Sequence, residues 1–567
     1  MSNLLTQKIW NIKTPDPQQQ VALSDALNVH PIVAQLLVNR GVSSPDVARQ
    51  FLSCGISDLH DPFLLEGMDA AVKRIKQAQK NKERVLIFGD YDVDGVTSSA
   101  LLYKALTRLG IEVFNHIPHR MHDGYGLNDG ISDIIEEKNV QLLITVDCGI
   151  TSIDEVAALK QSGLDIIIVD HHEPSEEGLP DALAIVDPKR KDCAYPFKHL
   201  AAVGLVGKLV QALFGTISQE ELDLIVLGTI ADVVPLRGEN RIFVKEGLPG
   251  IHQTKNKGLA ALINVAKIKG KVFKPYFVGF ILGPRINATG RMGSAKKSLK
   301  LLLSQDVKEA HQIAQDLDVM NSDRQKLQRE VVKEALACVE QEINFKEHKV
   351  IIIAKEGWHK GVLGIVASRL TETYSRPAIV ISLEDGVGTA SARSIEGFHL
   401  HEALESCSEA LENFGGHKLA AGLTIREEKI EEFRDLMNTF AQDVLEVRSL
   451  VPSVSIDCEV PLSSLSLDLV DKIDSLEPYG EGNPAPVFCS RQLTVKSKPA
   501  VLGRETLKFW VTDGEVSVAA LGFGMGKYAK ILFPGQKVDL AYQVAIDDWN
   551  KAPTVMLKLK DIKENED

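Results

Sequence analysis

The sequence contains no apolar run long enough to cross a membrane and no cysteine motif that would bind a metal. No uninterrupted apolar stretch reaches the ~20 residues that a membrane-spanning helix needs. The seven cysteines are scattered, odd in number and never spaced as Cys-x-x-Cys, which argues against a disulfide framework and a thiolate zinc site. The first residues also lack the basic start and long apolar centre of a secretion signal. We therefore expect reduced thiols, no membrane anchor and a cytoplasmic location.

The composition is that of a large globular chain. Its hydrophobic content of 44% and charged content of 25% are ordinary. The 567 residues exceed what one core can organise, and a prior of ~150 residues per domain suggests three or four domains. The formal net charge of −13 disfavours non-specific attraction to nucleic acid, so any nucleic-acid site must be a local basic groove.

Short β-rich runs alternate with helical stretches between about residues 70 and 235, which predicts a parallel sheet covered by helices on both faces. The predicted strands are residues 85–88, 111–117, 142–146, 166–169 and 184–186. Residues 305–342 contain no Gly or Pro and predict a long helix between two lobes. A second α/β unit begins at Lys349, and five strand-like runs after residue 450 predict a small antiparallel barrel, followed by a frayed end at 560–567.

The predicted fold class is therefore α/β, with two α/β lobes joined by a long helix and a β-barrel at the C-terminal end. The expected domains are a helical lead-in at 1–65, a first α/β domain at 66–235, a helical region with the connecting helix at 236–345, a second α/β domain at 346–448 and a barrel at 449–567.

Three carboxylates at alternate positions follow the first predicted strand. Asp90, Asp92 and Asp94 lie within Gly89–Gly95, directly after the apolar run at 85–88. Alternate carboxylates concentrate like charge in a small volume, and a divalent cation is the usual compensation. Taken alone, a solvated turn is an equally good interpretation of this segment.

Residues typical of metal sites also lie at the ends of three later segments that we expect to be strands. They are Asp147 after residues 142–146, Asp170-His171-His172 after residues 166–169, and Asp232 after residues 222–230. The carboxyl ends of parallel strands share one edge of the sheet, so these side chains can converge there. Singly, an Asp after a strand is often a helix cap, and adjacent histidines are usually surface or core residues. Together, carboxylate and imidazole groups without thiolate favour Mn²⁺ or Mg²⁺ over structural zinc.

In this order the motifs resemble those of the DHH phosphoesterase superfamily, named for its Asp-His-His triplet. Within it, the similarity is greatest to the single-strand-specific exonucleases, and it covers nearly all the chain. The other segments that carry it are Gly283–Arg291, Trp358–Arg369, Ser391–Ser394, Phe414–His417 and Pro478–Pro484. The resemblance implies lobes of the DHH and DHHA1 types and a barrel of the OB-fold type.

The resemblance also implies a centre with two divalent ions, Mn²⁺ or Mg²⁺. Asp147 would bridge the ions, and the other ligands would be Asp90, Asp92, Asp94, His171 and Asp232. Two of the three carboxylates at 90–94 would contact metal directly, and the third could instead hydrogen-bond to a ligand. The motif alone leaves open which two they are. The catalytic group would comprise Asp92, Asp147, His171 and His172. His172 resembles a phosphate contact or a proton donor to the leaving oxygen, with a supporting histidine as the alternative.

Phosphate groups on the substrate need donors, and planar guanidinium groups supply bidentate ones. Arg120 and Arg291 are therefore candidates to bind the scissile or neighbouring phosphates, with a solvated or ion-paired role as the ordinary alternative. In the second lobe, a pocket for a terminal phosphate is expected, because glycine lets main-chain N–H groups approach an anion closely. Its candidate residues are Ser391, Arg393, Gly415 and Gly416.

Single-strand selectivity calls for base-stacking faces and basic backbone contacts. Tyr125, Phe398 and Tyr479 are candidate platforms, with core or turn packing as the alternative. In the barrel, the candidate backbone contacts are Lys496, Lys498 and Arg504.

The function implied is a metal-dependent exonuclease that degrades single-stranded DNA from the 5′ end and releases mononucleotides, in DNA repair and recombination. A monomer is expected, with a single-strand-binding protein and a helicase as partners. One alternative is a phosphoesterase for oligoribonucleotides, cyclic dinucleotides or pyrophosphate, against which the terminal barrel and connecting helix count. Another is a scaffold on an inactive DHH domain, against which the retained, mutually repelling carboxylates count.

Overall fold

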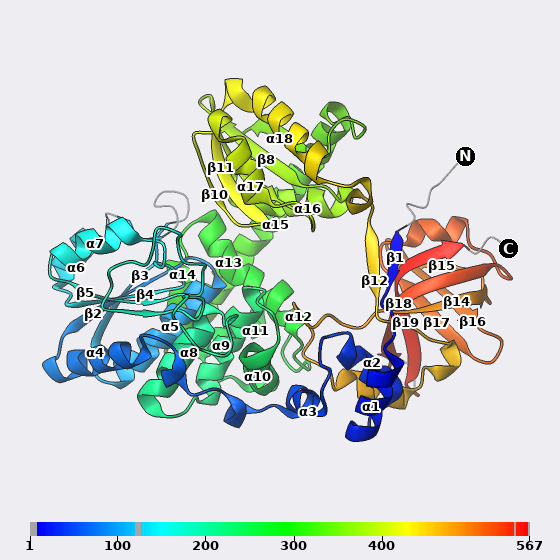
Figure 1. The fold of residues 1–567 in the computed structure, drawn as a ribbon, viewed down its shortest axis with the longest axis horizontal. Helices are drawn as coiled ribbons and strands as arrows, with labels where there is room; N and C mark the ends of the chain where they lie inside the picture. The colour runs from blue at the N-terminus through cyan, green and yellow to red at the C-terminus, as the bar shows by residue number, and fades with distance from the viewer. Residues whose placement is uncertain (1–7, 120–125, 129, 549–551, 565–567) are drawn as a thin grey trace.

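The protein is described from a computed structural model, which places residues 8–119, 126–128, 130–548 and 552–564. Figure 1 shows a large α/β lobe, a second α/β lobe and a β-barrel arranged around a common centre. Within the placed residues no single helix is long and apolar enough to cross a membrane, although the bent pair Pro17–Leu27 and Pro31–Val38 meets these criteria together.

The first lobe is built on a five-stranded parallel sheet in the order β3-β2-β4-β5-β6. All its strands except β3 are largely apolar and buried because helices cover both faces, as predicted for this segment. The chain order reverses between β2 and β4, and ligands bind at such a switch point in open parallel sheets. The strands are β2 (Arg84–Gly89), β3 (Glu112–His116), β4 (Leu142–Val146), β5 (Asp165–Val169) and β6 (Ala184–Val186).

Helices α5, α8 and α9 pack against one another in the main hydrophobic core of this lobe. The helix α15 (Val307–Glu342) has 36 residues and runs toward the second lobe, as the Gly- and Pro-free sequence predicts (Figure 1). The other helices of the first lobe are α4 (Met68–Asn81), α5 (Val93–Arg108), α6 (Ile131–Lys138), α7 (Ile153–Gln161), α8 (Ala202–Phe214), α9 (Gln219–Ala231), α10 (Gly238–Gly247), α11 (Lys257–Val265), α12 (Pro275–Phe277), α13 (Gly283–Met292) and α14 (Lys296–Leu303).

The second lobe has a five-stranded sheet in the order β10-β11-β9-β8-β7, parallel only between β7 and β8. Its strands are β7 (Ile351–Glu356), β8 (Ala378–Glu384), β9 (Val387–Arg393), β10 (Asn413–Gly416) and β11 (Ala420–Arg426). Its helices are α16 (Leu363–Tyr374), α17 (Leu400–Ser406) and α18 (Ile430–Val444).

The C-terminal barrel closes through five strands in the cyclic order β14-β16-β17-β19-β18, which is the OB-fold arrangement. One pair, β17 with β19, is parallel, so the barrel is not wholly antiparallel as expected. The expected fraying is also wrong up to Glu564, because β19 continues to that residue and Ile562 is buried. The elements are β13 (Cys458–Glu459), α19 (Leu467–Asp474), β14 (Phe488–Val495), β15 (Ala500–Leu502), β16 (Thr506–Thr512), β17 (Ser517–Gly522), β18 (Lys537–Asp547) and β19 (Thr554–Glu564).

The N-terminal helices pack on the barrel rather than forming a core of their own. Leu36 and Leu37 are fully buried in the same hydrophobic cluster as the barrel strands. The strand β1 (Ile9–Ile12) pairs in parallel with β12 (Ser453–Ile456), just before the barrel begins. The helices are α1 (Pro17–Leu27), α2 (Pro31–Val38) and α3 (Pro45–Ser53).

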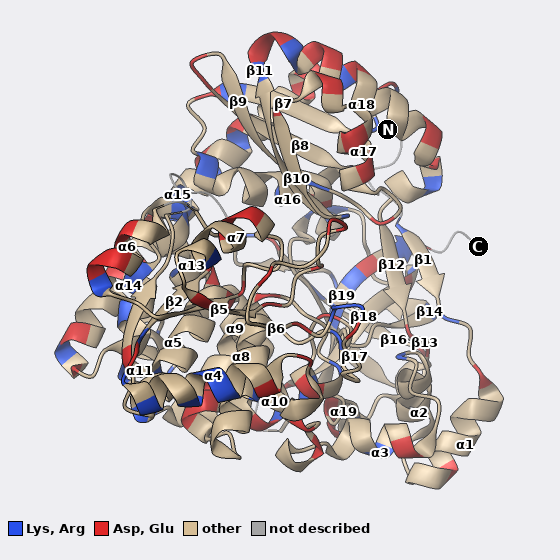
Figure 2. Cartoon of the chain, turned by 60° about the vertical axis from the view of Figure 1, so that its left-hand side comes forward, with Lys and Arg blue, Asp and Glu red and all other residues tan. Residues whose placement is uncertain are grey.

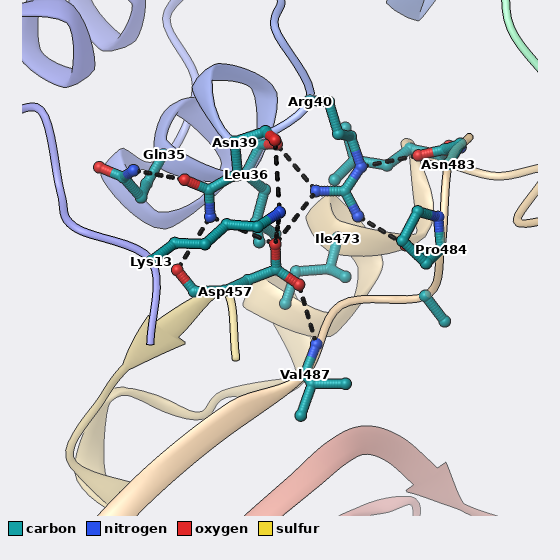
Figure 3. A network of polar contacts seen from close by, with 12 residues as sticks. Lys13, Gln35, Leu36, Asn39, Arg40, Asp457, Ile473, Asn483, Pro484 and Val487 are labelled. Carbon is teal, nitrogen blue, oxygen red and sulfur yellow. Dashed lines mark hydrogen bonds and ion pairs between the residues drawn. The ribbon is translucent and has the colours of Figure 1, made fainter. Parts of the chain in front are cut away.

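A buried polar network fixes this contact (Figure 3). Asp457 accepts hydrogen bonds from Lys13 Nζ at 3.2 Å and from Asn39 Nδ2 at 3.2 Å. The buried Arg40 donates from Nε to Asn483 Oδ1 and from Nη2 to the carbonyl oxygen of Pro484, each at 2.7 Å. Residues more than 400 positions apart therefore form one unit.

Arg241 in α10 connects the first lobe to this unit. Its guanidinium donates to the carbonyl oxygens of Phe51, Leu476 and Glu477 at 2.9, 3.0 and 2.8 Å, and it lies 3.9 Å from the centre of the Phe51 ring. The Pro478–Pro484 segment therefore lies at the junction between the first lobe and the barrel.

Candidate metal centre and phosphate cavity

The first carboxylates of the candidate site lie at the switch point of the parallel sheet. Asp92 caps α5, accepting hydrogen bonds from the backbone N–H of Asp94 at 2.8 Å and of Gly95 at 3.1 Å. Gly95 is required at this turn, because a Cβ there would lie 2.4 Å from the carbonyl oxygen of Asp90. The sequence thus folds so that Asp90, Asp92 and Asp94 leave β2 in a tight turn.

Asp94 is buried against two helices. Its oxygens accept hydrogen bonds from the backbone N–H groups of Ala202 at 2.7 Å and Val203 at 2.8 Å, at the start of α8. Helix α9 also approaches closely, since a Cβ on Gly228 would lie 2.7 Å from Asp94 Oδ1. Backbone donors therefore already engage both Asp94 oxygens.

Asp147 follows β4 and has a left-handed backbone with φ of 65°. A non-glycine residue in this region carries strain of about 1–3 kcal/mol, which persists only where surrounding contacts hold it. Its backbone N–H donates to the carbonyl oxygen of Val169 at 3.0 Å, and its side chain is buried. This conformation directs the Asp147 carboxylate toward the carboxylates of Asp90 and Asp92, which follow β2.

His171 lies between Asp147 and Asp232. Its Nε2 is 3.2 Å from Asp147 Oδ1 and 3.7 Å from Asp232 Oδ2. This nitrogen is buried and makes no well-aligned hydrogen bond with any placed residue. A buried imidazole nitrogen directed at two carboxylates without a hydrogen bond to either fits a cation shared by all three groups.

Asp232 reaches the site from a helix, not from a strand as expected. The apolar stretch 222–230 belongs to α9, and Asp232 is its C-cap residue. The stretch is almost entirely buried within the core, so its sequence has no exposed face to reveal a helical period.

Asp170 supports the two histidines from behind. Its Oδ1 lies 2.7 Å from His172 Nδ1, and its Oδ2 accepts from the backbone N–H of Ile150 at 3.0 Å. Burial alone would raise the pKa of Asp170, but the hydrogen bond and charge of His172 outweigh it and lower the pKa to about 2. Asp170 is therefore an ionised anchor for His172.

The carboxylates of Asp94, Asp147 and Asp232 lie close to other aspartates, whose negative charges repel them. Burial, and then the charges of neighbouring aspartates, raise the pKa of Asp147 and Asp232 well above the usual range. The same causes raise the pKa of Asp94 to about 7. Burial, reinforced by the charge of His172, lowers the pKa of His171 to about 3, so its imidazole is neutral. Bound cations would stabilise the ionised form of these carboxylates.

The donor set fits divalent ions that prefer oxygen and imidazole ligands. Candidate ligand atoms lie within 4.8 Å of one another in three overlapping groups: Asp90 with Asp92 and Asp147, Asp94 with His171 and Asp232, and Asp147 with His171 and His172. All six predicted metal ligands occur in these groups, and His172 joins them. No thiolate takes part, which suits Mn²⁺ or Mg²⁺.

A cavity of about 490 Å³ lies where the second lobe meets α13. Arg393 and Ser391 come from β9, and Arg393 Nη1 donates to Ser391 Oγ at 3.3 Å. Gly416 has a φ of 143°, and a Cβ there would lie 2.5 Å from the carbonyl oxygen of Ala420. The residues predicted to bind phosphate that line this cavity are Arg291, Ser391, Arg393, Gly415 and Gly416.

The cavity and the metal centre are adjacent. The rings of His172 and His417 are stacked with centroids 6.5 Å apart and planes at 13°. Arg291 reaches across from α13, where its Nη1 donates to the carbonyl oxygen of Gly361 at 3.2 Å. His417 of the second lobe therefore lies beside His172 of the first.

Four further expectations have different outcomes. Arg120 and Tyr125 fall outside the residues that the structure describes. Phe398 is fully buried against Phe440, so its proposed stacking role is wrong and the core alternative holds. Tyr479 is mostly buried, and its hydroxyl donates to the carbonyl oxygen of Ile473 at 2.7 Å, as in the turn-packing alternative.

The sequence interpretation also missed two neighbours of the site, Asp187 and Lys189. Asp187 follows β6 as Asp147 follows β4, so the same rule would have found it. Burial raises the pKa of Asp187 to about 7, and its Oδ1 accepts from the backbone N–H of Lys189 at 2.7 Å. Lys189 brings positive charge close to both histidines.

Comparisons with known families and proteins agree with this architecture. Residues 84–229 match the DHH family N-terminal domain, residues 347–443 the DHHA1 domain and residues 456–561 the RecJ OB domain. The chain is 38% identical to the single-stranded-DNA-specific exonuclease RecJ of Bacillus subtilis (strain 168), over 99% of this chain and 72% of that protein. It is 34% identical to the enzyme of the same name from Haemophilus influenzae, over 94% and 96% of the two chains.

Solved structures show the same arrangement. The crystal structure of RecJ in complex with Mn²⁺ from Thermus thermophilus superposes with a TM-score of 0.84 at 30% identity, covering 99% of this chain and 80% of that one. The complex of that protein with Mg²⁺ gives a TM-score of 0.79 at 28% identity, covering 99% and 79%.

Proposed function

Since the chain belongs to the RecJ family of single-stranded-DNA-specific exonucleases, we propose that it hydrolyses the phosphodiester bonds of single-stranded DNA from the 5′ end. The products are 5′-mononucleotides, and the reaction uses two divalent ions, Mn²⁺ or Mg²⁺. Metal complexes of the related Thermus thermophilus protein support the choice of ions. DNA repair and recombination are the processes in which such an activity serves.

The observation that carries this proposal is the adjacency of two unlike sites. A cluster of buried carboxylates and a neutral imidazole lies next to a cavity lined by arginine, serine and glycine. The first site suits metal ions, and the second suits a phosphate group. An exonuclease needs both, because it must engage a strand end and cut a bond close to that end.

We assign Asp147 as the ligand shared by the two ions and Asp90, Asp92, Asp94, His171 and Asp232 as the remaining metal ligands. When bound, such ions lower the pKa of a bound water and neutralise charge on the attacked phosphate. Asp94 is held by backbone donors of α8, which supports either direct ligation or a role in positioning.

His172 is assigned to the scissile phosphate or the leaving oxygen. Asp170 orients it through Nδ1, and His417 covers the ring from the second lobe. Asp170 therefore fixes which ring nitrogen can face the substrate.

The terminal phosphate is assigned to the cavity formed by Arg291, Ser391, Arg393, Gly415 and Gly416. Guanidinium groups offer paired donors, and the backbone N–H groups of glycines can approach an anion without a side chain in the way. A terminal phosphate held in this cavity would direct the adjacent phosphodiester bond toward the neighbouring metal centre. Arg120 and Tyr125 keep their proposed roles in binding phosphate and base.

The 1–65, 66–235, 236–345, 346–448 and 449–567 boundaries stay predictions, as do the monomeric state, a cytoplasmic location, and partners such as a single-strand-binding protein or a helicase. Lys496, Lys498 and Arg504 are proposed contacts to the strand in the barrel.

One experiment distinguishes the proposed function from the two alternatives. The protein is incubated with Mn²⁺ and single strands labelled at either end, beside duplex DNA, RNA and a cyclic dinucleotide. Mononucleotide release from the 5′ end of single-stranded DNA alone is expected. Preferred cleavage of the cyclic dinucleotide would favour a small-substrate phosphoesterase, and binding without cleavage would favour an inactive scaffold.

A further inference from the structure

Two aromatic side chains, Tyr276 and Phe280, are exposed on the first lobe. Tyr276 is 60% exposed and Phe280 is 72% exposed. Their rings stack on each other with centroids 5.2 Å apart and planes at 22°. Phe277 lies behind them and packs on Phe273 at 5.6 Å. Phe273 and Phe277 anchor the segment in the core, so the rings of Tyr276 and Phe280 face solvent from an anchored backbone.

This pair lies on the approach to the phosphate cavity. Phe280 lies in the one-turn π-helix Val278–Leu282, which leads into α13, and Arg291 of α13 lines that cavity. At a rise of 1.5 Å per residue, the backbone from Phe280 to Arg291 spans about 16 Å. Figure 1 places α12 on the side of the first lobe that faces the barrel, and Lys274 pairs with Glu477 of the barrel junction at 2.7 Å. The aromatic pair therefore lies between the barrel and the cavity.

The surrounding sequence is basic in an otherwise acidic chain. Residues 247–305 contain no Asp or Glu, whereas the whole chain has a net charge of −13. Figure 2 shows both signs mixed on outer helices such as α4, but no acidic residue on α11 or α13. Among the placed residues, the ion pairs of this segment involve none of Lys267, Lys269 and Lys271. The eleven basic residues of the segment are Lys255, Lys257, Lys267, Lys269, Lys271, Lys274, Arg285, Arg291, Lys296, Lys297 and Lys300.

We propose that Tyr276 and Phe280 form a stacking platform for bases of the single strand, a few nucleotides behind its 5′ end. Aromatic faces stack on any base, and neighbouring lysines attract the phosphates between bases, which is the combination that sequence-independent binding of single strands requires. The segment contains no acidic residue, so its charge complements the phosphates of a strand. The inference rests on the proposed exonuclease function and adds a binding site outside the cavity.

The test compares Phe280→Ala, Tyr276→Ala and the double variant with the wild-type protein. At about 3.4 Å per stacked nucleotide, 16 Å corresponds to about five nucleotides, so strands of three and of thirty nucleotides are used. We expect KM for the longer strand to rise roughly tenfold or more in the double variant, and cleavage of the shorter strand to stay unchanged. Phe280→Tyr, which keeps a ring, should behave as wild type. Phe63→Ala removes another exposed aromatic residue of this lobe and serves as the matched control.

Strands with one abasic site at successive positions from the 5′ end locate the stacked base. In the wild type, an abasic site at one or two positions near the fifth nucleotide should raise KM. In the double variant, an abasic site at these positions should leave KM unchanged. An identical abasic penalty in both proteins, or equal KM on the long strand, would overturn the platform. Normal cleavage by the double variant combined with loss of stimulation by an added single-strand-binding protein would also overturn it, and would assign the surface to a protein. Absence of cleavage by the wild type on every strand would instead refute the exonuclease function.

Discussion

Replacing Gly364 with Ala tests the phosphate cavity without removing any of its polar groups. A Cβ on Gly364 would lie 2.9 Å from Arg393 Nη2 and 3.0 Å from Ser391 Oγ, so these groups must move by about 0.5 Å to reach ordinary contact. A misplacement of about 1 Å can cost about 10²-fold in rate, and a hydrogen bond to a charged group contributes about 1.5–3 kcal/mol. We expect kcat/KM on strands with a 5′-phosphate to fall roughly tenfold.

The same substitution should not weaken the fold. Gly364 lies in α16, where Ala is favoured over Gly by up to about 1 kcal/mol. The assay measures kcat/KM on strands with a 5′-phosphate or a 5′-hydroxyl, together with Tm. Gly422→Ala is the matched control, because Gly422 lines the same cavity but its Cβ would lie 3.7 Å from the nearest atom. An unchanged kcat/KM, or equal losses on both kinds of strand, would refute the role given to Ser391 and Arg393.

Three other substitutions test the remaining contacts. Asp147→Ala should abolish cleavage while leaving strand binding largely intact, and Mn²⁺ should no longer raise Tm by the usual binding linkage; wild-type turnover would show that the bridging assignment is wrong. Arg393→Ala should weaken engagement of a 5′-phosphate more than overall strand affinity, measured on free and end-blocked strands; equal losses on both would count against the terminal-phosphate pocket. Arg241→Met removes three hydrogen bonds to carbonyl oxygens and should cost about 3 kcal/mol at the junction, measured by urea unfolding and by proteolysis near residues 477–484. Unaltered protease resistance would contradict that estimate.

The first lobe was largely predictable because most of its strands are continuous apolar runs. Residues 142–146 and 184–186 agree with β4 and β6 residue for residue. In a parallel sheet, the position of a strand also fixes the edge at which the following side chain emerges, so Asp147 and His171 could be placed together from sequence. Asp232 was found for the wrong structural reason, because a helix buried on nearly all sides has the same apolar sequence as a buried strand.

Contacts between lobes could not be predicted in this way. His417 lies beside His172 because two separately folded sheets meet there, and no local pattern encodes that meeting. The packing of α2 on the barrel was equally hidden, because the apolar residues of Pro31–Val38 indicate a buried helix without showing what buries it. Exposed side chains such as Phe280 look like core residues in a sequence, because hydrophobicity does not reveal which face they take.

The parallel pairing of β1 with β12 has a consequence for synthesis of the chain. Ile9 emerges from the ribosome 444 residues before Ser453, its partner. At about 5–20 residues per second, this delay is about 20–90 s, long enough for the lobe that carries Asp147 to form first. During that time the barrel strands that bury Leu36 and Leu37 do not yet exist, so α2 completes its packing only after the last part of the chain is made.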